Sequence, residues 1–338
     1  MGKISNYKIA TLGSHSALQI LKGAKDEGFS TVCIAEKGKM KPYQSYKVAD
    51  EFIEVDSFKD YFNIEKQIIK SNSIIIPHGS FVAYLGFQNV KKVKAMYYGN
   101  KEILEWESDR TKERQWLEKA GLKLPKIYKD PKDIDRAVIV KYDGASGGKG
   151  YFIANNQDEF NEGVAQYAKG RRQTTQEYIV GVPIYVHYFY SPLTKELEVM
   201  GFDSRYESNA DSIGRIAARD QLTADIRTSY TVTGNIPLVV RESLLPKIFE
   251  MGEAVVKVAK KLTGRELFGP FCLEGVIDPN LDFYIFEISA RIVAGTNPFV
   301  NGSPYTWLRY DEPMSTGRRI ARDIKMAIEQ DKLEKVLG

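Results

Sequence analysis

The sequence is poor in cysteine and has no long apolar run. Its two cysteines, Cys33 and Cys272, each lie inside an apolar stretch, which excludes a disulfide framework and a cysteine-based zinc site. No run of Ile, Leu and Val is longer than the one at 74–76, whereas a membrane-spanning helix needs roughly 20 apolar residues. The first residues also lack the apolar segment of a signal peptide. We therefore expect a cytoplasmic protein that does not bind membranes.

An excess of charge of one sign is also missing. The 338 residues carry 48 Lys and Arg against 44 Asp and Glu, and the basic residues are scattered among acidic ones, so no nucleic-acid partner is expected. Hydrophobic residues make up 43% of the chain and aromatic residues 12%, which is enough for large cores and excludes intrinsic disorder. At roughly 150 residues per domain, the length predicts two or three packed units.

The first hundred residues alternate between short apolar runs and helical patterns. Strands are predicted at 7–12, 31–35, 52–55 and 73–76, and helices at 16–27 and 61–70. Strand–helix–strand repetition of this kind predicts a parallel sheet covered by helices.

From about residue 100 the pattern changes to short strands between longer helices. Helices are predicted at 101–120, 241–263 and 316–336, and strands at 137–141, 151–154, 176–180, 184–191 and 197–202. We therefore expect an N-terminal α/β domain with a parallel sheet over 1–99 and an α+β domain over 100–338.

A glycine-rich loop lies between two of the predicted strands. Its glycines are Gly144, Gly147, Gly148 and Gly150, with Lys141 before them and Lys149 among them. Glycines let the backbone approach an anion closely, so that free N–H groups can bind phosphate oxygens. A Walker A loop is excluded by the spacing, and a dinucleotide-binding fingerprint is excluded because a strand follows where a helix should begin. What remains is a glycine flap over ATP phosphates, or a flexible hairpin with Lys141 pointing into solvent.

Two glutamates interrupt a pair of apolar strands. If Asp278 opposes Phe283 across the turn, Glu274 lies opposite Glu287, with Cβ atoms roughly 5 Å apart and like charges repelling. A divalent cation would neutralise the pair, and oxygen ligands without histidine favour magnesium. A slip of one residue would instead leave one glutamate in water and the other beside a lysine. Arg291 follows on the Glu287 face, where it could clamp a phosphate or acyl phosphate, or simply pair with Glu287.

Taken together, Lys141, the glycine flap, the segment 176–181 and the glutamate pair resemble the ATP-grasp superfamily. Longer strings narrow the resemblance: Gly13-Ser14-His15-Ser16, Pro77-His78-Gly79-Ser80-Phe81, Arg205-Tyr206-Glu207-Ser208-Asn209, Thr233-Gly234-Asn235, Arg241-Glu242-Ser243-Leu244-Leu245 and Phe286-Glu287-Ile288-Ser289-Ala290-Arg291. Over essentially the whole chain, these strings are similar to the archaeal formate-dependent FAICAR synthetases, the PurP family of purine biosynthesis.

This resemblance implies a Rossmann-like N-terminal domain on the side of the nucleotide substrate AICAR, followed by an ATP-grasp domain with a small lobe at about 125–181 and a large lobe at about 182–338. It also implies a homo-oligomer, and a reaction in which AICAR, formate and ATP give FAICAR, ADP and phosphate through formyl phosphate. The implied Mg²⁺ or Mn²⁺ ligands are Glu274 and Glu287, and the implied catalytic residues are Lys141, Lys149 and Arg291. The implied ATP contacts are Lys141, Gly144, Gly147, Gly148, Lys149, Glu177, Tyr178, Ile179, Val180 and Glu207. The implied AICAR contacts are His15, Ser80, Asn209 and Asn235.

The positions of His15 and Ser80 agree with this assignment. Each follows a predicted parallel strand, and loops at the carboxyl edge of such a sheet are where open α/β sheets bind ligands. Without the resemblance, His15 would be read as a neighbour of a helix cap, Ser80 as a turn residue, and His78 and His187 as structural. Two departures stand out: Ser289 replaces the Asn of many ATP-grasp enzymes, and Ser146 stands where a basic flap residue is expected. The alternatives are a ligase for a different acid or amine and a nucleotide-binding regulator without catalysis.

Overall fold

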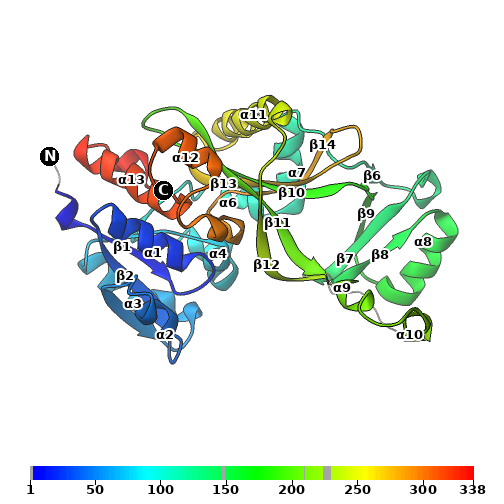
Figure 1. Ribbon diagram of the computed structural model, residues 1–338, viewed down its shortest axis with the longest axis horizontal. Helices are drawn as coiled ribbons and strands as arrows, with labels where there is room; N and C mark the ends of the chain where they lie inside the picture. Colours follow the sequence, from blue (N-terminus) through cyan, green and yellow to red (C-terminus); the bar gives the residue numbers. More distant parts are fainter. Residues whose placement is uncertain (1–2, 147–148, 209, 224–229) are drawn as a thin grey trace.

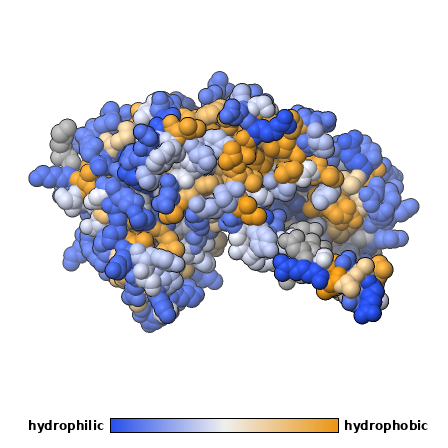
Figure 2. All heavy atoms as spheres, in the orientation of Figure 1, coloured by the Kyte–Doolittle hydropathy of each residue, from blue (hydrophilic) through white to orange (hydrophobic). Residues whose placement is uncertain are grey.

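The computed structural model describes residues 3–146, 149–208, 210–223 and 230–338, with only the backbone described at 143–146, 149, 210–211 and 230. In these residues the chain forms three sheets, which lie side by side along its longest dimension (Figure 1). The N-terminal sheet lies at one end, a small sheet at the other, and a large sheet between them (Figure 1). Apolar residues gather on the visible surface over the middle of the molecule, while both ends are mostly hydrophilic (Figure 2).

The N-terminal sheet is parallel throughout, as predicted. Its strands are β1 (Lys8–Leu12), β2 (Ser30–Glu36), β3 (Glu51–Val55), β4 (Ser73–Ile75) and β5 (Met96–Tyr97), in the order β3-β2-β1-β4-β5. The helices along this part of the chain are α1 (Ala17–Asp26), α2 (Lys41–Ser45), α3 (Tyr61–Lys70), α4 (Gly79–Leu85) and α5 (Phe87–Val90). The strand order reverses between β1 and β4, so the loops after these two strands are neighbours at the carboxyl edge.

The C-terminal helix α13 (Thr316–Glu329) packs on α1 from the opposite end of the sequence (Figure 1). The close approach needs two glycines: a Cβ on Gly23 would lie 2.2 Å from the Arg318 nitrogen, and one on Gly317 would lie 2.2 Å from the Gln19 oxygen. Ile20 of α1 and Ile324 of α13 belong to the same buried cluster. The end of the chain therefore completes the core around the N-terminal sheet.

Two antiparallel sheets make up most of the remainder. The small sheet has the order β6-β9-β7-β8, from β6 (Ile127–Tyr128), β7 (Val138–Ser146), β8 (Lys149–Ala154) and β9 (Gln173–Glu177). The large sheet has the order β12-β11-β10-β13-β14, from β10 (Val182–Tyr190), β11 (Leu197–Ser208), β12 (Tyr230–Leu238), β13 (Gly269–Ile277) and β14 (Phe283–Ser289). Their helices are α6 (Leu104–Ser108), α7 (Arg110–Lys119), α8 (Gln157–Gly163), α9 (Ala210–Ile213), α10 (Ala218–Thr223), α11 (Leu245–Thr263) and α12 (Pro304–Tyr310).

Several predicted elements have other bounds in the structure, among them the following three. The single helix expected at 101–120 is two helices, because Asp109 leaves the helical conformation (φ −106°, ψ 112°) and caps α7 through the Thr111 and Lys112 N–H groups. The strand expected at 176–180 is β9, which ends at Glu177. The helix expected to reach 336 ends at Glu329, and Asp331 beyond it has a left-handed φ of 57°. Of the described helices, none combines the length and apolar character that crossing a bilayer would require.

Candidate active site

Three cavities follow one another along β14. The hinge cavity, of about 160 Å³, contacts Tyr284 and Phe286, and the central cavity, of about 330 Å³, contacts Phe286 and Glu287. The inner cavity, of about 230 Å³, contacts Glu287, Ser289 and Arg291. Glu287 therefore lines both the central and the inner cavity, and it marks the point where a group could pass from one to the other.

Glu274 and Glu287 oppose each other on β13 and β14, as predicted, but the predicted turn register is wrong. Ile277, not Asp278, pairs with Phe283, and the ladder shifts by one residue between Glu274 and Gly275. Gly275 pairs with Ile285 and Glu274 with Glu287, so Phe286 is the extra residue of a β-bulge. The bulge restores the pairing that the simple register had assumed.

The two carboxylates lie in different environments. Glu274 is 3% exposed, whereas Glu287 is exposed to the cavities. Burial, together with repulsion from Glu287, raises the pKa of Glu274 above its usual value. Its counter-ion is Arg205 of β11, whose Nη2 donates to Oε2 at 2.6 Å, rather than the lysine considered above, and the Ser289 hydroxyl donates to Oε1 at 3.3 Å.

A facing, mutually repelling carboxylate pair suits a hard divalent cation. No group of three or more His, Cys, Asp or Glu side chains in the described part of the chain is placed to hold a metal. A cation at Glu274 and Glu287 would therefore need further oxygens, such as those of phosphates, which is the coordination that Mg²⁺ commonly adopts with nucleotides.

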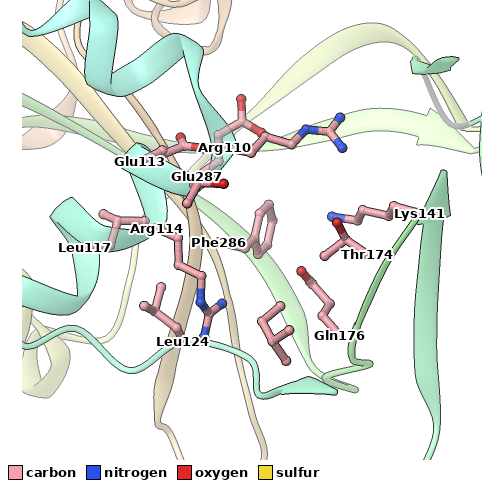
Figure 3. Close-up of a pocket in the computed structure, with 12 residues that line it drawn as sticks. Arg110, Glu113, Arg114, Leu117, Leu124, Lys141, Thr174, Gln176, Phe286 and Glu287 are labelled. Atoms are coloured by element: carbon pink, nitrogen blue, oxygen red, sulfur yellow. The ribbon is translucent and has the colours of Figure 1, made fainter. Parts of the chain in front are cut away.

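Lys141 of β7 faces this cleft rather than solvent. Its Nζ lies 5.9 Å from the centre of the Phe286 ring, and it points across the central cavity with Thr174 and Gln176 (Figure 3). Burial lowers the pKa of Lys141, and nearby Arg110 adds to the effect. An anion in the cleft would raise the pKa of Lys141 again and so offset the effects of burial and of Arg110.

The glycine loop joins β7 and β8, which are antiparallel as the flap hypothesis requires. Gly147 and Gly148 lie outside the described residues, and only the backbone of Gly144 and Lys149 is described. Lys149 pairs with Ser146 across the hairpin. The loop is thus placed on the small sheet, on the strand that carries Lys141.

The segment 177–180, which the resemblance assigns to ATP, only partly lines a cavity. Glu177, Tyr178 and Ile179 line the hinge cavity, but Val180 does not and is 71% exposed. The Glu177 carboxylate is held by Arg136, whose Nη1 donates at 2.9 Å. Glu207, near the end of β11, lines none of the three cavities.

The inner cavity brings the N-terminal part of the chain to the glutamate pair. His15 and Asn235 line it, whereas Ser80 sits in the first turn of α4 and does not, and Asn209 lies outside the described residues. His15 has a left-handed φ of 54°, and its ring stacks on His78 with centroids 5.2 Å apart. Burial lowers the pKa of His15 to about 3, with His78 and Arg291 adding to the effect, so the ring is neutral near pH 7.

The similar proteins are named synthetases, and the similarity extends over almost their whole length. Two family models match, described as a protein of unknown function (DUF1246) over residues 9–128 and a domain of unknown function (DUF1297) over 152–338. A protein of Pyrococcus abyssi named 5-formaminoimidazole-4-carboxamide-1-(beta)-D-ribofuranosyl 5'-monophosphate synthetase is 58% identical, covering 98% of each chain. The protein of the same name from Methanocaldococcus jannaschii is 51% identical, covering 98% of this chain and 94% of its own. The chain belongs to this synthetase family.

Solved structures place the PurP-family chain among known folds. The crystal structure of an IMP biosynthesis protein PurP from Thermococcus kodakaraensis has a TM-score of 0.78 and 31% identity, covering 98% of this chain and 100% of that one. An ADP complex of the N5-carboxyaminoimidazole ribonucleotide synthetase PurK has a TM-score of 0.66 at 15% identity, covering 95% of this chain and 78% of that one, which shows a common fold alone. The fold is a parallel α/β sheet followed by ATP-grasp sheets, as predicted.

Several inner-cavity residues of this PurP-family chain escaped the sequence analysis. Asp203, which is 1% exposed, accepts hydrogen bonds from His187 Nε2 and Asn235 Nδ2, both at 2.7 Å. Asp203 gave no signal, because its partners come from strand pairing rather than from a local motif. His187 is buried as expected of a structural residue, but it also lines the cavity.

Arg291 has a different partner from the one considered above. Its Nη2 lies 3.1 Å from Glu107 at the end of α6, and not against Glu287. Its Nε is buried, with no hydrogen-bond partner among the described residues. The guanidinium thus lines the inner cavity with Glu107 beside it.

Proposed function

We propose that the protein is an ATP-dependent FAICAR synthetase that formylates AICAR with formate in IMP biosynthesis, releasing ADP and phosphate. The observation that carries this proposal is the position of Glu287, opposite Glu274 and shared by the central and inner cavities. Phosphoryl transfer depends mainly on positioning and charge neutralisation, and an acidic pair between two cavities meets both needs.

In this proposal ATP spans the hinge and central cavities. The adenine binds at Glu177, Tyr178 and Ile179, which line the hinge cavity. Val180 and Glu207 line neither cavity, and their assignment to ATP rests on the resemblance to the family alone. Lys141, Lys149 and the flap glycines Gly144, Gly147 and Gly148 bind the phosphates. Glu274 and Glu287 hold Mg²⁺, or Mn²⁺ in its place, and the bound cation supplies neutralisation of phosphate charge.

The acceptors occupy the inner cavity. A formate oxygen attacks the γ-phosphorus, the bond from that phosphorus to ADP breaks, and formyl phosphate forms, with Arg291 stabilising its charge. AICAR is held through His15 and Asn235, which line this cavity, while Ser80 and Asn209 are assigned to it by the resemblance to the family. The AICAR amine then attacks the formyl carbon. The C–N bond forms as the C–O bond breaks, the amine loses a proton, and inorganic phosphate leaves.

We further propose that residues 1–99 form the AICAR-side domain and residues 100–338 the ATP-grasp domain. The small lobe would cover about 125–181 and the large lobe about 182–338. We also propose a cytoplasmic homo-oligomer with small-molecule substrates and neither nucleic-acid nor membrane partners.

Omission of single substrates tests the proposal. With ATP, Mg²⁺, AICAR and formate, FAICAR and ADP should appear in equal amounts, and leaving out formate should stop both. ADP release with a different acid would support another ATP-grasp ligase, and binding of ATP and AICAR without any ADP would support a regulator.

A further inference from the structure

Strand β14 lies at the edge of the large sheet, and two glutamates cover its free side. The Ile288 N–H donates to Glu113 Oε1 at 2.8 Å, and the Ala290 N–H donates to Glu107 Oε2 at 3.0 Å. An edge strand has no neighbour for these groups, and a buried N–H without a partner is costly. The two carboxylates therefore stand where the next strand would be.

The backbone groups that they hold alternate with the side chains of the site. In a strand, successive side chains point to opposite faces, so Glu287 and Ser289 of β14 share a face, and Arg291, two residues beyond the strand, lines the inner cavity with them. Fixing the N–H groups of residues 288 and 290 fixes the direction of the side chains on either side. Glu107 also contacts Arg291 directly, at 3.1 Å.

The break between α6 and α7 makes this arrangement possible. In one continuous helix, residues 107 and 113 would be rotated by six steps of about 100°, which leaves them about 120° apart around the axis. They could not both reach a single strand. Because Asp109 interrupts the helix, Glu107 and Glu113 come from two separate helices and face the same strand.

We infer that Glu107 and Glu113 are positioning residues, which hold the unpaired side of β14 so that Glu287 and Arg291 face the transferred phosphoryl group. The inference rests on the proposed function, because it assigns the purpose of this contact to the metal and phosphate site. Glu113 acts on Glu287 through the Ile288 N–H, and Glu107 acts on Arg291 both through the Ala290 N–H and by its ion pair.

Mn²⁺ binding in the presence of a non-hydrolysable ATP analogue, followed by electron paramagnetic resonance, tests the role of Glu113. Glu113→Gln keeps an oxygen acceptor, and we expect Mn²⁺ affinity within about threefold of wild type. Glu113→Met removes the acceptor, and we expect at least a tenfold loss. The matched control is Glu65→Met, because Glu65 is equally buried and accepts the Lys94 N–H at 2.7 Å in the N-terminal part.

Glu65→Met should lower the melting temperature about as much as Glu113→Met but leave Mn²⁺ affinity unchanged. Wild-type Mn²⁺ affinity in Glu113→Met, or an equal loss in Glu65→Met, would overturn the inference. If Glu113→Met does not fold, Glu107→Met is tested in its place. We expect kcat of Glu107→Met to fall at least tenfold while its Mn²⁺ affinity stays that of wild type. An unchanged kcat would contradict the inference. Glu287→Gln tests the proposed metal site separately from the positioning role of Glu113. If this variant leaves Mn²⁺ binding intact, the proposed metal site is wrong, and the inference is wrong as well.

Discussion

Replacing Arg205 by methionine should expose the electrostatic cost of the glutamate pair. Arg205 Nη2 lies 2.6 Å from Glu274 Oε2, and its guanidinium stacks 4.1 Å from the centre of the Tyr185 ring. Methionine keeps much of the aliphatic stem but removes the charge. Glu274 would then be buried and face Glu287 with no cation beside it.

The expected cost is about 2 kcal/mol. Removing one partner of a buried ion pair costs about 3–5 kcal/mol. The Arg205 side chain is 31% exposed, so solvent screens part of the interaction, and Glu274 can take up a proton to limit the cost. For a chain of 338 residues, about 2 kcal/mol corresponds to a fall in melting temperature of about 3 °C.

Thermal unfolding of wild type, Arg205→Met and Arg205→Lys in the presence of a non-hydrolysable ATP analogue, with and without MgCl₂, measures this cost. The lysine variant keeps the charge and should melt close to wild type. Mg²⁺ should raise the melting temperature of Arg205→Met more than that of wild type, because it replaces the missing positive charge. If Arg205→Met melts with wild type, or if Mg²⁺ shifts both proteins equally, the electrostatic reasoning is wrong.

Three further predictions concern His78, Glu198 and Glu287. Burial lowers the pKa of His78 from 6.5 to about 4, so the folded protein keeps the ring neutral where the unfolded chain binds a proton, and about 3 kcal/mol of unfolding free energy is lost as the pH falls from 6.5 to 4. Urea unfolding of His78→Gln at a series of pH values should lack this loss. A pH dependence equal to that of wild type would contradict the prediction. Glu198→Ala removes the nearer of two carboxylates beside the buried guanidinium of Arg319, at 2.9 Å, and leaves Asp323 at 3.4 Å. It should cost about 3 kcal/mol of unfolding free energy, whereas Glu196→Ala, on the surface, should cost under about 1 kcal/mol. Similar costs would refute the burial argument. Glu287→Gln should abolish turnover, since it removes a metal ligand, and its melting temperature should be no lower than that of wild type, since it also removes one of two repelling charges. An active variant would rule out the metal role.

Local pattern was enough to predict most strands of the sheets, but not β5, β6 or β12. Strands of a parallel sheet are buried on both faces and read as apolar runs, which is why β1 to β4 were found with errors of one or two residues. The alternation of polar and apolar residues also placed Glu274 and Glu287 on one face. The bulge at Phe286 was not predictable, because the turn keeps Asp278 outside the ladder and the extra residue then corrects the register.

The contacts of the site that were not predicted all join residues that are far apart in the sequence. Arg205 reaches Glu274 across 69 residues, and Glu113 reaches Ile288 across 175. Periodicity reports which face a residue occupies on its own element, but it does not report what lies opposite on a distant one. The helix break at Asp109 was missed for a related reason, since charged helical sequence continues on both sides of it.

The most direct test of phosphoryl activation is the fate of the formate oxygens. If a formate oxygen attacks the γ-phosphorus and the amine later displaces phosphate from the formyl carbon, that oxygen leaves with phosphorus. Turnover with ¹⁸O-labelled formate, AICAR, ATP and Mg²⁺ should therefore give inorganic phosphate carrying one ¹⁸O atom for each FAICAR formed, as measured by mass spectrometry. Unlabelled phosphate alongside FAICAR would contradict the transfer of phosphate to formate between the two cavities.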